Sequence, residues 1–147
     1  MLIGLPGCGK STLAAELPYH SVSSDFFVEQ LAAEKGMTYT EGFDLVIKEA
    51  TKMMNELLDK TIEEEYSFVW DQTNLSVKSR KGKIDQLKAA GYDVVAHVFN
   101  ISPEALSARR KSRPEKVIAE SIERRMAASF EQPTIEEGFS EIVSYTD

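Results

Sequence analysis

Short apolar runs alternate with longer amphipathic segments along this chain, and the alternation predicts strands joined by helices. From residue 40 to 62 the apolar residues recur at spacings of three and four, which is the pattern of one long helix with a single buried face. Strands are expected at 1–3, 19–23, 67–71, 92–99 and 139–145, and helices at 11–17, 26–33, 40–62, 77–90, 103–113 and 115–130. Strands and helices that alternate in this way form a parallel sheet with helices on both faces.

The segment from Gly4 to Ser11 follows the first expected strand and fits the phosphate-binding template G-x-x-x-x-G-K-[ST]. Its glycines let the backbone turn tightly and direct N–H groups at a polyphosphate, and the following helix adds the positive end of its dipole. Lys10 is expected to neutralise the β- and γ-phosphates, and the Ser11 hydroxyl to bind Mg²⁺. The residues expected to contact ATP or another NTP are Gly4, Leu5, Pro6, Gly7, Cys8, Gly9, Lys10, Ser11 and Thr12.

A strongly basic stretch is divided by Pro114 into the ends of two helices. Arg109, Arg110, Lys111 and Arg113 precede this proline, and Arg124 and Arg125 follow it. The stretch predicts a helical hairpin over about 109–125 that acts as a lid, with arginines that stabilise charge on a transferring phosphoryl group. A solvated basic turn is the alternative interpretation.

Two aspartates follow expected strands and are the candidate carboxylates of the site. In open α/β sheets, ligands bind at the carboxyl ends of the strands. Asp25, after the second strand, would accept the proton of a hydroxyl acceptor, unless Ser24 or Asp25 only caps the next helix. Asp71, after the third strand, would hold Mg²⁺ through water, unless it only caps a turn.

Length and charge limit the possibilities further. The 147 residues suit one domain with one core, expected to span 1–147. The lack of a membrane-length apolar run or a secretory signal, together with a single cysteine, predicts a cytoplasmic protein without a membrane partner. The net charge is −7, but residues 78–125 hold 12 basic and 6 acidic residues and so carry +6. This segment forms either a solvated helical face or a surface that receives phosphates.

Several of these motifs together resemble the kinase domain of the phage polynucleotide 5′-kinase/3′-phosphatase and its wider family of small P-loop kinases. The resemblance rests on Gly4–Ser11, Ser24-Asp25, Asp71-Gln72-Thr73-Asn74-Leu75, Val98-Phe99-Asn100 and the basic stretch from Arg109 to Arg113. It covers nearly the whole chain. It implies a three-layer α/β/α P-loop kinase with a five-stranded parallel sheet in the order 2-3-1-4-5 and a helical lid.

The resemblance also implies roles for individual residues. Lys10, Asp25 and Arg113 would be the catalytic residues, with Asp25 as general base and Arg113 as the lid arginine on the transferred phosphates. Arg109 would occupy the lid position one turn earlier and contact the nucleotide. Ser11 and Asp71 would be the residues that hold Mg²⁺. The acceptor side would comprise Asp25, Asp71, Thr73 and Asn74.

Two positions differ from the phage enzymes. Where they carry an arginine three residues after the catalytic aspartate, in contact with the acceptor strand's phosphate, this chain has Val28. Where they carry aspartate directly before Thr-Asn, this chain has Gln72 and places Asp71 one residue earlier, as in relatives that phosphorylate other acceptors. These differences bear on the acceptor and leave the kinase chemistry intact.

Three functions are therefore considered. The preferred one is an ATP- or NTP-dependent, Mg²⁺-dependent kinase whose partner is the 5′-hydroxyl end of DNA or RNA. The first alternative keeps the chemistry but transfers the phosphoryl group to a small-molecule alcohol, such as a nucleoside, a sugar or an antibiotic. The second alternative is an NTPase switch that is not a kinase.

Overall fold

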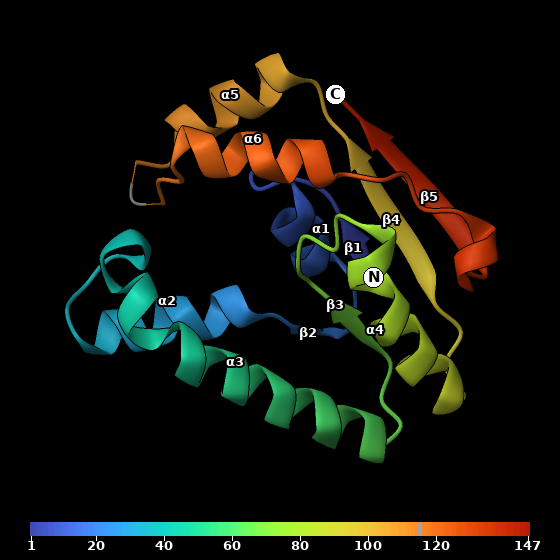
Figure 1. Ribbon diagram of the computed structural model, residues 1–147. Coiled ribbons are helices and arrows are strands. Elements are labelled where there is room, and N and C mark those ends of the chain that lie inside the picture. The colour runs from blue at the N-terminus through green and yellow to red at the C-terminus, as the bar shows by residue number, and fades with distance from the viewer. Residues whose placement is uncertain (115) are drawn as a thin grey trace.

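The computed structural model describes residues 1–114 and 116–147, and in these ranges strands and helices alternate as expected (Figure 1). The strands are β1 Leu2–Ile3, β2 His20–Val22, β3 Phe68–Trp70, β4 Val95–Asn100 and β5 Glu141–Thr146. The helices are α1 Lys10–Glu16, α2 Ser24–Glu34, α3 Tyr39–Glu63, α4 Val77–Ala89, α5 Pro103–Lys111 and α6 Glu120–Ser129, with a 3₁₀ helix at Ile135–Glu137. The structure confirms the α/β class.

The strands are all paired in parallel, but they form two hydrogen-bonded sheets. One has the order β1-β4-β5 and the other consists of β2 and β3. Each sheet reproduces part of the predicted order 2-3-1-4-5. The prediction of one continuous five-stranded sheet is therefore corrected to a three-stranded and a two-stranded sheet.

The division of the sheet has a local cause at the ends of β1 and β3. These strands have only two and three residues, so few ladder positions face each other. The Asn74 side-chain amide donates to the Leu2 carbonyl over 2.8 Å, and the Gly4 N–H donates to the Thr73 carbonyl over 3.0 Å. The loop after β3 therefore binds the backbone of β1 and the start of the phosphate loop, in place of a regular ladder between the two strands.

Helices cover both faces of the strands, as the alternation of side chains along a strand requires. Leu2 packs with Ala14 of α1 and with Val69 on one face. Ile3 belongs to the largest core cluster on the other face, where α3 and α4 pack. The buried members of that cluster are Met1, Ile3, Val22, Met54, Leu58, Trp70, Ile84, Leu87, Val94, Ala96, Val98 and Phe139.

Helices α2 and α3 pack closely against each other. A Cβ atom at Gly42 of α3 would lie 2.7 Å from the Cβ of Ala32 in α2, so only glycine permits this approach. Val28 is fully buried and packs in a cluster with Leu31, Val46 and Ala50. This contact places the start of α3 beside the C-terminal half of α2.

The lid forms from α5 and α6, which lie side by side at the top of Figure 1, with α2 and α3 at the bottom. Helix α6 begins at Glu120, so the predicted start at residue 115 is too early, and position 115 itself lies outside the described residues. None of the ten residues of α6 is buried. Helix α6 is thus attached to the domain by few apolar contacts, which suits an element that moves, whereas α5 buries Leu106 against Cys8 and Phe99. Within the described ranges, no helix is both long and apolar enough to span a bilayer.

Candidate active site

The phosphate loop connects β1 to α1 and has the backbone that its sequence predicts. Gly7 and Gly9 have φ angles of 81° and 107°, which residues with a side chain rarely adopt. A Cβ atom at Gly4 would lie 2.6 Å from Cys8 Sγ and 3.1 Å from Phe99 Cβ, so this glycine is required by packing. The fixed glycines therefore shape the loop for different physical reasons.

Lys10 begins α1 and folds back into the loop. Its ammonium group donates to the Gly4 carbonyl over 2.9 Å and to the Leu5 carbonyl over 3.1 Å, and the residue is only 9% exposed. These carbonyl dipoles hold a largely desolvated cation at the position where a polyphosphate would be enclosed. Phosphate oxygens carry full negative charge and would make stronger bonds to the ammonium than the carbonyls do.

Ser11 and Asp71 meet at the end of the loop. The Ser11 hydroxyl donates to Asp71 Oδ2 over 3.2 Å. Burial raises the pKa of Asp71, while the Lys10 charge and the Ser11 hydrogen bond partly offset this effect. A nearby cation stabilises the charge of a carboxylate that is desolvated in this way, so the pair is suited to Mg²⁺ and its water ligands.

Asp25 lies in the first turn of α2. The helix N-cap is Ser23, which makes no side-chain capping bond, so the alternative that Ser24 or Asp25 caps this helix is wrong. Asp25 Oδ1 accepts a 2.8 Å hydrogen bond from the Tyr39 hydroxyl, and Asp25 Oδ2 lies 3.2 Å from Lys116 Nζ. The carboxylate is therefore engaged by side chains from α3 and from the lid.

The lid arginines make different contacts. Arg109 Nη1 donates to the Cys8 carbonyl in the phosphate loop over 2.8 Å. Arg110 Nη1 pairs with Glu123 Oε1 of α6 at 3.0 Å, which ties the two lid helices together. Arg113 is exposed and lines the cleft. The lid is thus anchored to the phosphate loop by Arg109.

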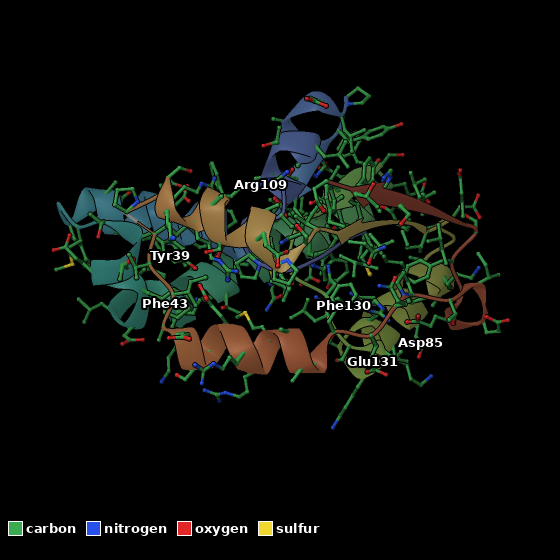
Figure 2. All side chains as sticks on the ribbon, turned by 90° about the horizontal axis from the view of Figure 1, so that it is seen from above. Tyr39, Phe43, Asp85, Arg109, Phe130 and Glu131 are labelled. Atoms are coloured by element: carbon green, nitrogen blue, oxygen red, sulfur yellow. The ribbon has the colours of Figure 1, made fainter. Side chains whose placement is uncertain are left out.

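These groups surround one cleft of about 690 Å³. Figure 2 looks down on α5 and α6 and labels Arg109 on the lid side and the neighbouring rings of Tyr39 and Phe43 on α3, whose centroids are 5.5 Å apart. The lining residues are Pro6, Gly7, Cys8, Gly9, Lys10, Ser11, Thr12, Ser24, Asp25, Tyr39, Phe43, Ile47, Asp71, Gln72, Thr73, Phe99, Ile101, Arg109, Arg110, Ser112, Arg113, Lys116, Ile118, Met126, Tyr145 and Thr146. The structure therefore brings both expected aspartates, the phosphate loop and the lid arginines to one cavity.

The loop after β3 contributes unequally to this cleft. Asp71, Gln72 and Thr73 line it, whereas Asn74 is buried and lies outside its lining. The Asn74 side-chain amide donates to the Leu2 carbonyl. The backbone of Asn74 has a φ angle of 47°, which turns the chain tightly at this residue. Asn74 thus has the structural role described above, and its expected contact with an acceptor stays a prediction.

A family model described as an AAA domain matches residues 1–133. The chain belongs to the AAA domain family. This is a P-loop family that includes small kinases, so membership indicates NTP binding and phosphoryl transfer, with Mg²⁺ as the accompanying ion. The comparison with curated proteins gives no match.

The residues of this AAA domain fit a magnesium–nucleotide complex. Mg²⁺ is usually held by one or two protein oxygens together with phosphate oxygens and water. Ser11 and Asp71 supply a hydroxyl and a carboxylate beside Lys10. Among the described residues, no group of three or more His, Cys, Asp and Glu side chains forms a metal cage by itself. The site therefore suits an ion that arrives with the nucleotide.

Sequence reasoning missed three side chains of this AAA domain. Tyr39 and Lys116 hold the Asp25 carboxylate, and neither belongs to a recognisable motif. Lys83 of α4 donates to Gln72 Oε1 over 2.9 Å and to Asn74 Oδ1, and burial lowers its pKa to about 8. Lys83 was counted with the basic helix face, and only its burial beneath the loop after β3 reveals its different role.

Proposed function

We propose that this protein is a Mg²⁺-dependent kinase that transfers the γ-phosphate of ATP or another NTP to a hydroxyl oxygen. The observation that carries the proposal is that Asp25 faces the same cleft as the phosphate loop and the lid arginines. An NTPase that only hydrolyses nucleotide needs a positioned water, whereas a kinase needs a carboxylate beside the acceptor subsite. Asp25 supplies that carboxylate.

Each residue has a defined part in the transfer. Lys10 binds the β- and γ-phosphates, and Arg113 approaches the transferring group from the lid. The acceptor O–H bond breaks as the oxygen forms its bond to the γ-phosphorus, and the proton passes to Asp25. The bond between the γ-phosphorus and the β,γ-bridging oxygen breaks, and the products are a phosphate monoester and NDP. Mg²⁺, when bound beside Ser11 and Asp71, supplies charge neutralisation on the phosphate oxygens.

The preferred acceptor is the 5′-hydroxyl of a DNA or RNA strand. Support comes from the cations that border the cleft on the lid side, namely Arg109, Arg110, Arg113 and Lys116. Cations at such a surface attract a phosphate backbone and make binding depend on salt.

A small-molecule alcohol is the second candidate, and two observations favour it. Val28, at the position of the expected acceptor-phosphate arginine, is fully buried between α2 and α3 and leaves no basic group there. The wall of the cleft on α3 carries the apolar side chains of Phe43 and Ile47. Apolar walls with few polar groups are typical of small-ligand sites.

A transfer assay with [γ-³²P]ATP tests the proposal. The acceptor panel contains 5′-hydroxyl oligonucleotides of DNA and RNA, nucleosides, sugars and hydroxylated antibiotics. Label on an acceptor with wild-type protein, and its loss in Asp25→Asn with ATP binding retained, are the expected results. Release of inorganic phosphate alone, with no labelled acceptor and no effect of Asp25→Asn, would indicate the NTPase switch instead.

The same assay separates the two acceptor classes. The acceptor KM for a polynucleotide should rise steeply between about 50 and 200 mM salt, because counterions return to the released phosphates. The KM of an uncharged small acceptor should stay nearly constant over that range. Label confined to small alcohols would reject the polynucleotide assignment and keep the kinase.

A further inference from the structure

The Asp25 carboxylate is held on both oxygens by residues from two different elements. Tyr39, the first residue of α3, donates its hydroxyl to Oδ1 over 2.8 Å. Lys116 approaches Oδ2 to 3.2 Å and also lies 3.4 Å from Glu29 Oε1. A carboxylate oxygen has two lone pairs, so each oxygen retains one for an acceptor hydroxyl. The contacts orient the carboxylate without occupying it fully.

Tyr39 acts only as a donor in this arrangement. Burial, together with the charges of Asp25 and Glu29, raises the pKa of the Tyr39 hydroxyl far above its ordinary value, so the phenol keeps its proton. Lys116 Nζ lies 4.4 Å from the centroid of the Tyr39 ring, over its face. The two side chains that hold Asp25 therefore also contact each other.

Lys116 comes from the lid and not from the body of the domain. It lies between α5 and α6 and is separated from Asp25 by 91 positions. The next residue, Val117, donates its backbone N–H to the Thr40 hydroxyl over 2.9 Å. This end of the α5–α6 pair thus contacts the first turns of α2 and α3.

We propose that Lys116 is a positioning residue through which closure of the lid orients the general base Asp25. This inference rests on the proposed kinase function. In the closed arrangement Lys116 and Tyr39 fix both carboxylate oxygens, whereas an open lid leaves only Tyr39 in place. Transfer to the acceptor is thereby coupled to the same lid movement that brings Arg113 toward the phosphates.

The exposure of these side chains argues against a purely structural ion pair. Lys116 is 20% exposed, but its partners Asp25 and Glu29 are 51% and 57% exposed. Ion pairs with such exposed partners contribute about 0–1 kcal/mol to folding. Loss of Lys116 should therefore leave the free energy of unfolding nearly unchanged and should lower kcat.

Three lid variants test the inference on the full chain, with whichever acceptor the transfer assay identifies. Lys116→Met removes the charge and keeps most of the side-chain length, Lys116→Arg restores a cation, and Lys111→Met removes a lid lysine that is exposed and outside the cleft. Lys116→Met should lower kcat by roughly tenfold or more, since small misplacements of a catalytic group cost up to about 100-fold. ATP affinity, measured with a non-hydrolysable analogue, should change by less than about twofold because the phosphate loop is untouched. Lys116→Arg should recover most of the lost kcat, and Lys111→Met should match wild type.

A double-mutant cycle decides whether Lys116 acts through Asp25. In the Asp25→Asn background, measured under single-turnover conditions, Lys116→Met should cause little further loss, because the base that it positions is already absent. An equal loss in both backgrounds would show that Lys116 contacts the phosphates directly and would overturn the inference. So would a wild-type kcat in Lys116→Met while Asp25→Asn is inactive. If Asp25→Asn itself retains full transfer, the proposed function fails instead.

Discussion

The Ser11 hydroxyl donates a hydrogen bond to Asp71 Oδ2 over 3.2 Å, although 60 positions separate the two residues. The contact joins the start of α1 to the end of β3 and places a hydroxyl and a carboxylate next to Lys10. We propose that a magnesium ion arriving with a nucleotide would be held beside these two oxygens. The two residues thus form the proposed metal side of the site.

Asp71→Asn tests this metal side. The amide keeps the size and the acceptor oxygen of the side chain but removes its charge. The Mg²⁺ concentration for half-maximal transfer should rise about 10- to 100-fold, the range found for outer-shell partners of a metal. A magnesium titration of the transfer assay at saturating nucleotide measures it. An unchanged magnesium dependence would remove Asp71 from the metal site.

Lys10→Met tests the phosphate side. The variant keeps the length of the side chain and removes the ammonium that bonds to the Gly4 and Leu5 carbonyls. We expect kcat to fall about 10²- to 10³-fold, which is the effect of losing one donor from a preorganised electrostatic site. The free energy of unfolding should change little or increase, since a largely buried cation is removed. A variant that transfers phosphate at the wild-type rate would contradict the assigned role.

Glu137→Gln tests a buried ion pair that supports the loop after β3. Arg80 is fully buried and binds Glu137 through Nε at 2.8 Å and Nη2 at 3.1 Å, while its Nη1 donates to the carbonyls of Asn74 and Leu75. Removing the carboxylate leaves a buried guanidinium without its counter-charge, which costs about 3–5 kcal/mol. Urea unfolding measures the loss.

Asp85→Asn is the matched control for that experiment. Asp85, labelled in Figure 2, pairs with Lys81 at 3.3 Å, and both side chains are more than half exposed. Removing this pair should cost only about 0.3–0.5 kcal/mol, as for other exposed helical pairs. Equal losses in the two variants would show that burial does not control the strength of the Arg80 pair.

Lys83 should make the stability of the protein depend on pH. Burial lowers its pKa from 10.5 to about 8, so between these values the unfolded chain binds more protons than the folded one. Stability should therefore rise with pH through this window, by at most about 3 kcal/mol from this residue. Urea unfolding at about pH 7.5 and 9.5 measures the change.

Two variants isolate the contribution of Lys83. Lys83→Met should show a smaller rise in stability with pH than wild type, because the titrating group is absent. Lys88→Met removes an exposed lysine from the same helix region and should keep the wild-type rise. Identical pH dependence in all three proteins would show that Lys83 keeps its ordinary protonation in the fold.

The sequence by itself determined the parts of the protein whose chemistry is local. The phosphate loop is specified within eight consecutive residues. Its glycines, its lysine and its serine all lie in one short loop, so their roles do not depend on distant segments. The positions of Asp25 and Asp71 followed from the rule that parallel strands end at one edge of a sheet, and both line the cleft. The strand–helix alternation was likewise predictable.

Only the tertiary structure decided the features that depend on contacts between distant segments. Arg80 and Lys83 belong to the basic segment 78–125, yet packing against the loop after β3 buries Arg80 completely and Lys83 in part, and so draws both away from a phosphate-binding surface. The Asn74 amide takes the Leu2 carbonyl and thereby helps to divide the expected sheet in two. Lys116 meets Asp25 only because the lid contacts the first turns of α2 and α3. The sequence alone does not show whether a charged side chain is buried or which group it contacts, because both depend on how distant segments pack.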